Sequence, residues 1–209
     1  NHDYLYGLGG YHLKLTETDM EGSFHHSLMN QDYQRCEQMI VHGFDINLPD
    51  RKNLPALYYA VIDNDYESCI FLLNYEPKLE MKITLKSSDV SHVGFTAGSL
   101  GALVRDNYLI GDCDIYFIHI ATTYKNNLME SFLKYKSDCI AAKSPYLKLT
   151  PLHYAILHGN YDNYIKLIDY GADINEATIF GLTALALNAI QGDVEICKHL
   201  MKYQATPFA

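Results

Sequence analysis

The sequence lacks the features by which membrane, nucleic-acid-binding and metal-dependent proteins are usually recognised. No run of apolar residues is long enough to span a bilayer, so we expect no membrane insertion. Lysine and arginine total 16 against 25 acidic residues, a net charge of −9 that argues against nucleic acid as the partner. The chain has no H-E-x-x-H, no paired-cysteine zinc spacing and no G-x-S-x-G. We therefore expect no metal, no cofactor and no catalytic residue.

The last third of the chain repeats one helix–turn–helix pattern with a period of 33 residues. The first copy reads Thr150-Pro151-Leu152-His153-Tyr154-Ala155, then Gly159-Asn160, Leu167-Ile168 and Gly171-Ala172-Asp173-Ile174-Asn175. A shift by one period lands on Thr183, Leu185, Gly192-Asp193 and Leu200-Met201. A fixed period of this length indicates stacked supersecondary units, because one unit cannot bury its own apolar face.

Weaker copies extend this register toward the N-terminus. A small residue in the first helix recurs at intervals of 33, 61, 34 and 33, at Ser27, Ala60, Ala121, Ala155 and Asn188. A closing ring ends the second helix at His42, Tyr75, Tyr135, Tyr170 and Tyr203, and the third unit reaches it one residue early. These columns predict about five units, two in residues 23–79 and three in residues 113–206.

This pattern resembles the ankyrin repeat, whose signature is T-P-L-H-x-A followed by a G-A-D-x-N close. Only the fourth unit, beginning at Thr150, carries the complete signature. The resemblance implies a mostly α-helical solenoid of about five helix-turn-helix units that presents a surface instead of performing chemistry. Thr150 is placed to cap the first helix and Pro151 suits its first turn. Extended loops, here called finger loops, should link the units.

Individual columns predict further local structure. The glycines should permit the turn between helices and the left-handed helix ends, at Gly159 and Gly192 and at Gly43 and Gly171 respectively. His25, His119 and His153 share one column, and the resemblance implies that their rings bond within the junction of finger loop and helix. A structural role is thus expected for them, and not a metal or catalytic one.

The five cysteines form no C-x-x-C and, being odd in number, predict no disulfide framework. Cys36, Cys69 and Cys197 share a column that should point into the helix stack. We therefore expect them to be small core residues in a reducing, intracellular compartment. Cys113 and Cys139 lie outside that column.

An insertion explains the long interval, which exceeds one period by 28 residues. The excess lies in residues 80–112, where Met81-Lys82-Ile83-Thr84-Leu85 alternates like a strand and residues 90–96 do so less cleanly. Ala97-Gly98-Ser99 reads as a turn. These features predict a β-hairpin grown out of a finger loop, with a degenerate sixth repeat as the alternative. Such insertions often carry binding, and we expect this one to do so, with padding of a weak junction as the alternative.

The two ends depart from the repeat pattern. Residues 1–22 form an extension that can cap the first unit or contribute a short hairpin, and its glycine cluster is not a phosphate loop. Residues 207–209 stop where another finger loop should begin, so we expect further domains beyond Ala209.

In the ankyrin family, binding residues lie at the finger tips and on the concave side of the first helix. By register, the finger positions are Arg51, Lys52, Leu54, Tyr146, Leu147, Leu149, Ile179, Phe180 and Leu182. The helix positions are Ile62, Asp63, Thr123, Tyr124, Leu157, His158, Ile190 and Gln191. Apolar residues at the tips favour a protein partner. Alternatively, they pack against a neighbouring finger loop or a missing C-terminal domain.

The leading functional hypothesis is a non-enzymatic scaffold that binds a protein partner through its concave surface, finger tips and insertion. The alternative is a targeting part of a larger enzyme whose catalytic domain lies outside these residues. The usage of Tyr, Asn, Ile and Lys resembles that of ankyrin effectors of intracellular bacteria or large DNA viruses. This resemblance implies that the partner is a eukaryotic host protein, bound in the host cytoplasm or nucleus. We also expect the protein to be a monomer. The family also implies hydroxylation of Asn47 and Asn175, with a turn-stabilising role as the alternative.

Overall fold

The computed structural model describes residues 5–6, 12–13, 24–50, 53–80, 83–85, 113–145 and 147–208. Internal packing divides the chain into two compact units, Asn1–Lys78 and Leu79–Ala209, and each is described by itself. The described residues are mostly helical, with little strand. None of the helices in these ranges combines the length and the apolar composition that a membrane crossing requires.

The first unit contains a short β ribbon and two pairs of helices. Strand β1 (Leu5–Tyr6) is antiparallel to β2 (His12–Leu13), with Leu5 opposite Leu13. The helices are residues 24–29, α2 (Tyr33–Val41), α3 (Ala56–Ile62) and α4 (Tyr66–Leu73). Aromatic stacking holds this unit together: the Phe24 ring stacks on Phe44 at 4.4 Å and the Tyr33 ring on Phe71 at 4.9 Å.

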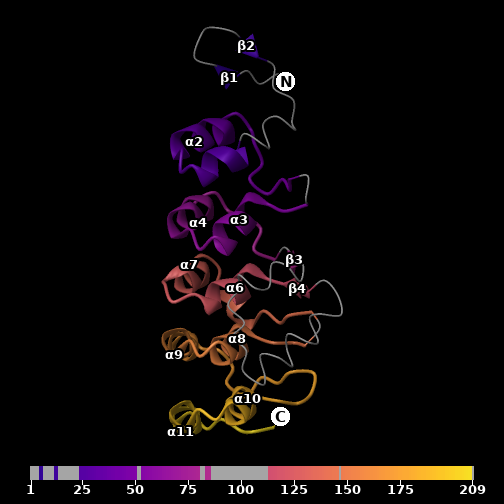
Figure 1. Ribbon diagram of the computed structural model, residues 1–209, viewed down its shortest axis with the longest axis vertical. Coiled ribbons are helices and arrows are strands. Elements are labelled where there is room, and N and C mark those ends of the chain that lie inside the picture. Colours follow the sequence, from indigo (N-terminus) through magenta and orange to yellow (C-terminus); the bar gives the residue numbers. More distant parts are fainter. Residues whose placement is uncertain are drawn as a thin grey trace. The chain divides into compact units, whose positions relative to one another are not determined.

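The second unit stacks three helix pairs (Figure 1). They are α6 (Phe117–Thr123) with α7 (Leu128–Tyr135), α8 (Pro151–Leu157) with α9 (Tyr161–Asp169), and α10 (Ala184–Gln191) with α11 (Val194–Lys202). The first helix of each pair packs against the first helix of the following pair: α6 against α8, and α8 against α10. Ala121 and Ala155 are fully buried there, because small side chains let the helix backbones approach closely.

The backbone repeats with the period read from the sequence. Each second helix outside the third unit begins at a side chain that accepts a hydrogen bond from a backbone N–H three residues on: Asp32, Asp65, Asn160 and Asp193. Left-handed backbone lies between the two helices at Gln31, Asn64, Gly159 and Gly192. It recurs after the second helix at Gly43, Glu76, Gly171 and Gln204. The predicted roles of the four glycines are confirmed, and the Thr150 cap, which accepts from His153 N–H, is confirmed as well.

The third unit departs from this pattern. Tyr124, at the end of α6, is extended, and α7 runs into a 3-10 helix, η1 (Ser137–Ala141). Two buried amides explain the first departure, since the Nδ2 groups of Asn160 and Asn163 both donate to the carbonyls of Thr122 and Tyr124, at 2.8–3.1 Å. These bonds hold the end of α6 open against the start of α9. The sequence pattern places Asn160 in the turn between the helices and gives Asn163 no particular role, so this clamp was not predicted.

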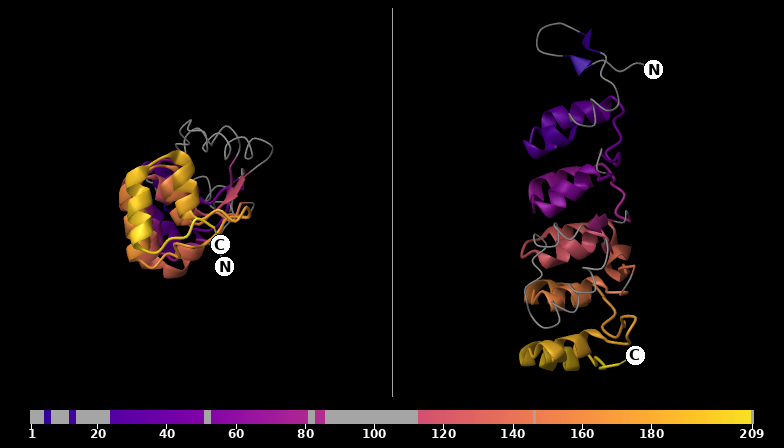
Figure 2. Two further views of the ribbon diagram at one scale, coloured as in Figure 1. Left: turned by 90° about the horizontal axis from the view of Figure 1, so that it is seen from below. Right: turned by 45° about the vertical axis from the view of Figure 1, so that its right-hand side comes forward.

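Three finger loops close with the same backbone hydrogen bond. Asp50 N–H donates to the Leu54 carbonyl, Ser144 N–H to Leu149, and Thr178 N–H to Leu182, at 2.9–3.0 Å. In the second unit, the loops that follow α7 and α9 project on the same side of the helices (Figure 2). They also pair with each other, because Ile179 N–H donates to the Leu147 carbonyl at 3.1 Å.

A second short ribbon borders the 80–112 insertion. Strand β3 (Ile83–Leu85) is antiparallel to β4 (Cys113–Ile115), with Ile83 opposite Ile115. Strand β3 falls within the segment predicted to alternate like a strand. The second predicted strand, residues 90–96, and the predicted turn after it lie outside the described residues.

The prediction for the cysteine column holds at two of three positions. Cys36 and Cys69 are fully buried, as expected for small core residues. Cys197 is only half-buried, so the prediction is wrong there. Cys36, Cys69, Cys139 and Cys197 are all free thiols.

Candidate protein-interaction surface

The finger loop of residues 178–182 presents two apolar side chains on a fixed backbone. Ile179 is 54% exposed and Phe180 is 66% exposed. The Thr178 hydroxyl oxygen accepts hydrogen bonds from the N–H groups of Phe180 and Leu182, at 3.3 and 3.2 Å, and Gly181 supplies the left-handed turn. The tip is therefore shaped by the loop's own bonds, while its two largest side chains point outward.

The remaining finger positions of the second unit are more covered. Leu147 is half-buried, and Leu149 is only 2% exposed, so the expectation that Leu149 belongs to an exposed tip is wrong. It is instead the residue on which the loop closes. Leu182 forms an antiparallel β-bridge with Phe208, and the Thr183 hydroxyl donates to the Thr206 carbonyl. The chain's own last described residues thus cover part of this position.

The first helices contribute fewer exposed groups than the register implied. Ile190 is 50% exposed, and Gln191 is exposed as well. The Nε2 of Gln191 donates a hydrogen bond to the Leu157 carbonyl at 3.0 Å. Half-buried residues fill the other predicted positions of the second unit: Thr123, Tyr124, Leu157 and His158. The apolar exposure therefore concentrates on Ile179, Phe180 and Ile190.

In the first unit, Leu54 and Ile62 are half-buried and Asp63 is exposed. Arg51 and Lys52 lie outside the described residues, as does Tyr146 of the second unit.

Two members of the histidine column, His119 and His153, have the predicted structural role, whereas His25 is buried and its predicted junction bond stays a prediction. Nδ1 of His119 accepts from Tyr116 N–H at 3.2 Å, and its Nε2 bonds the Ala142 carbonyl of the following loop at 3.1 Å. Nδ1 of His153 accepts from Thr150 N–H at 3.0 Å. Burial lowers the pKa of both rings to about 4, so they are neutral at physiological pH. The Cys-His-Asp-Glu side chains of the described ranges form no group of three or more that could hold a metal ion.

Asn47 and Asn175 tie successive loops together. The Asn47 Oδ1 accepts from Lys78 N–H at 2.7 Å, and the Asn175 Oδ1 accepts from Thr206 N–H at 2.8 Å. Each asparagine N–H in turn donates to the aspartate two residues earlier. These bonds give both side chains the turn-stabilising role that stood as the alternative to modification.

Comparison with known proteins agrees with this geometry. The family model for ankyrin repeats (many copies) matches residues 143–187, which contain the complete signature and the 144–149 and 178–182 finger loops. Residues 143–187 thus match the ankyrin-repeat family. Such repeats are generally protein-binding modules without catalytic activity of their own.

Relatives of two kinds are similar to this chain. Palmitoyltransferase ZDHHC13 of Homo sapiens is 22% identical over 213 residues, which covers 83% of this chain and 34% of that protein. The putative palmitoyltransferase ZDHHC13 of Danio rerio is 21% identical over 194 residues, or 74% and 30%. The putative ankyrin repeat protein FPV034 of Fowlpox virus (strain NVSL) is 33% identical over 64 residues, or 31% and 15%. The chain thus spans about a third of the length of the palmitoyltransferases that it matches.

Proposed function

We propose that the helix pairs stack into one ankyrin solenoid of five units and that this solenoid binds a protein partner without turnover. The 80–112 insertion extends one of its finger loops. The observation that carries the proposal is the tip of the 178–182 loop, where Ile179 and Phe180 stand exposed on a hydrogen-bonded backbone. An exposed aromatic residue on a rigid loop loses little conformational freedom when a partner covers it, so its burial is retained as affinity.

The binding surface runs from this tip along the finger loops and the first helices. Ile190 and Gln191 extend it on α10, and the 144–149 loop extends it through the Ile179–Leu147 backbone bond. Arg51, Lys52, Leu54, Ile62, Asp63 and Tyr146 complete it by register. Apolar tips with polar neighbours match the composition of protein interfaces, in which a few aromatic anchors carry most of the binding energy.

The partner is a eukaryotic host protein, met by a monomeric effector in the reducing cytoplasm or nucleus of the host cell. The likeness to an ankyrin repeat protein of Fowlpox virus supports a host-directed role. The free, buried thiols of Cys36 and Cys69 are compatible with a reducing compartment.

A second function is favoured by a different observation. The palmitoyltransferases that resemble this chain are about three times its length, since it covers 34% of the human protein. The ankyrin repeats then serve as the targeting part of a larger enzyme whose catalytic domain lies outside these residues. In both cases the repeats bind protein, and only the second predicts an activity in the full-length product.

Affinity capture from host-cell lysate tests the proposal. We expect Phe180→Ala and Tyr146→Ala to lose captured partner, and truncation of a central aromatic anchor should cost about 2 kcal/mol or more of binding free energy. A deletion of residues 80–112 tests the insertion. Val41→Ala is the matched control, because Val41 is an 83% exposed apolar residue on a second helix, and second helices contribute no residue to the proposed surface.

Loss with Phe180→Ala and retention with Val41→Ala would support the surface. An unchanged set of captured proteins in all three surface variants would refute it. To separate the two functions, the captured protein is incubated with the full-length product: chemical modification of the partner favours the enzyme.

A further inference from the structure

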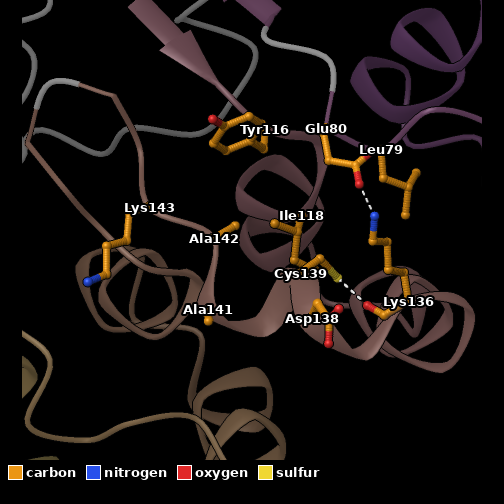
Figure 3. Close-up of a pocket in the computed structure, with 10 residues that line it drawn as sticks. All are labelled: Leu79, Glu80, Tyr116, Ile118, Lys136, Asp138, Cys139, Ala141, Ala142 and Lys143. Atoms are coloured by element: carbon orange, nitrogen blue, oxygen red, sulfur yellow. Dashed lines mark hydrogen bonds and ion pairs between the residues drawn. The ribbon is translucent and has the colours of Figure 1, made fainter.

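A cavity of about 380 Å³ opens in the second unit beside η1 (Figure 3). Its apolar wall comes from Leu79, Ile118, Ala141 and Ala142, with the Tyr116 ring above them. This volume lies at the lower end of the range that ligand pockets occupy, and it is enough for one large side chain. All of these residues belong to the unit Leu79–Ala209.

The cavity exists because two repeat columns have changed at this point. Ile46, Leu79 and Ile174 occupy one column, in which Cys139 stands for the third unit, one residue early. A thiol is smaller than a branched aliphatic side chain. Its Sγ is also turned to the Lys136 carbonyl, to which it donates at 2.8 Å. The space filled by a larger side chain elsewhere is therefore left open.

The neighbouring column has lost the bond that joins successive loops. Asn47 and Asn175 reach the backbone of the next loop, but Glu80 and Ile140 take their place in the second and third units. Glu80 instead forms an ion pair with Lys136 at the edge of the cavity. A charged rim thus replaces the closed amide junction of the other units.

The rim favours a positive charge. Lys136 pairs with Glu80 and Lys143 pairs with Glu176, the latter at 2.9 Å. Asp138 lines the same cavity, and within the described ranges no cation pairs with it. Among the described lining residues, two acidic groups, Glu80 and Asp138, and two basic groups, Lys136 and Lys143, surround the apolar floor. Both lysines are already paired, so a cation entering there is attracted to Asp138.

We infer that this cavity receives an apolar side chain of the protein partner that carries, or adjoins, a basic group. This inference rests on the proposed function. Lys143 directly precedes the 144–149 finger loop, and its ion-pair partner Glu176 precedes the 178–182 loop by two residues, so the cavity adjoins the proposed surface. A pocket of this kind holds the buried anchor around which an interface is built.

Methyl NMR with 2-phenylethylammonium as the probe tests the pocket itself. At about 10 mM probe, which suits the weak binding of a small fragment, we expect shifts of the Leu79 and Ile118 methyl signals. The neutral analogue 2-phenylethanol should shift them less. Ala142→Leu should abolish the shifts by filling the cavity, whereas Ala172→Leu, in the corresponding loop after α9, should keep them. Asp138→Asn should weaken binding of the ammonium probe and leave binding of the neutral analogue unchanged. Because this variant leaves the apolar packing intact, it also tests the pocket in case Ala142→Leu does not fold.

Absence of shifts at Leu79 and Ile118, or shifts that persist in Ala142→Leu, would overturn the pocket. Equal binding of the neutral analogue would overturn its preference for a cation. With a captured partner in hand, Ala142→Leu should weaken binding about tenfold. A pocket that binds the probe while the partner's affinity is unchanged would overturn the assignment to a partner side chain. Failure of the proposed function shows separately, as an unaltered affinity in Phe180→Ala.

Discussion

The amide oxygen of Asn175 accepts hydrogen bonds from both the backbone N–H and the hydroxyl of Thr206, at 2.8 and 3.1 Å. Asn47 accepts the same kind of hydrogen bond from the backbone N–H of Lys78. In both cases the donor lies 31 residues after the asparagine. One side chain thus fixes the spacing between successive loops in both units of the molecule.

Replacing this oxygen should loosen the junction. We expect Asn175→Ala to lower the free energy of unfolding by about 1 kcal/mol, because the bond lies in a partly solvated loop and its net contribution is modest. Urea unfolding followed by circular dichroism measures the change. Asn175→Asp, which retains an acceptor oxygen, is the matched control and should stay within about 0.5 kcal/mol of the native protein. Equal losses in both variants would contradict the argument.

The amide clamp at Asn163 should matter more. This side chain is 2% exposed and donates to the carbonyls of Thr122 and Tyr124. Asn163→Leu leaves those carbonyls with fewer donors in a buried site, so we expect a loss of about 1–3 kcal/mol in unfolding free energy. Asp162→Leu, at the exposed neighbouring position of α9, controls for added apolar bulk. A loss no larger than that of the control would show that the clamp does not stabilise the fold.

Acid should destabilise the protein in a window set by two histidines. Burial lowers the pKa of His119 and His153 from 6.5 to about 4, so both are neutral when folded and protonate first in the unfolded chain. Their contribution is complete above pH 6.5 and is lost as pH falls toward 4, by up to roughly 3 kcal/mol for each ring. The midpoint of urea unfolding, measured at pH 7.5, 5.5 and 4.5, checks this loss of stability. His119→Gln should flatten the profile, and an unchanged slope would contradict it.

A carboxylate provides an internal comparison at lower pH. Hydrogen bonds from Lys134 and Lys166 lower the pKa of Glu130 to about 2. Its contribution is present above its ordinary value of 4.5 and is lost only as pH falls toward 2. We expect Glu130→Gln to lower stability equally at pH 7.5 and 5.5. A difference confined to pH 5.5 would point to another group.

The thiols should be chemically silent in the folded protein. Burial raises the pKa of Cys36 to about 11 and that of Cys139 to about 12, and it raises the pKa of Cys69 as well. With iodoacetamide at pH 8, peptide mass spectrometry should show these three alkylated at least about 100-fold more slowly than in urea, since the thiolate is the reactive form. Rapid alkylation of Cys36 or Cys69 would contradict their burial.

Hydroxylation of Asn47 and Asn175 is a separate prediction from the family resemblance. Incubation with a host asparaginyl hydroxylase should add about 16 Da, one oxygen, to the peptides that hold them. Asn53, on a finger loop outside that column, serves as the internal control. No mass gain at either column position would leave the two side chains with their structural role alone.

The repeat pattern was readable because each column has a narrow physical requirement. A cap such as Thr150, a small residue such as Ala155 and a left-handed position such as Gly171 each admit few residue types, so their spacing predicted the helices. The departures have no such signature. Asn163 reads as an ordinary helix residue, although it bridges two carbonyls of another unit.

The candidate surface was predicted less completely than the fold. Position in the repeat placed Ile179 and Phe180 at an exposed tip, but it also placed Leu149 there, and Leu149 is buried by loop closure. The position of a residue in the repeat shows which loop it belongs to, but it does not show whether its side chain points to solvent or into the protein. The cavity beside Cys139 was not predicted for another reason. It depends on a smaller side-chain volume than other units have at this position, and no single residue in the sequence indicates that difference.

Apart from two asparagines, four residues with side chains hold the left-handed backbone that glycine holds at equivalent positions: Gln31, Glu76, Lys148 and Gln204. Each costs the folded chain on the order of 1 kcal/mol relative to a residue without a Cβ atom. These four positions therefore hold backbone strain that glycine would remove. A variant with glycine at those four positions would be a more stable scaffold, on which the residues at the loop tips can be changed to bind chosen partners.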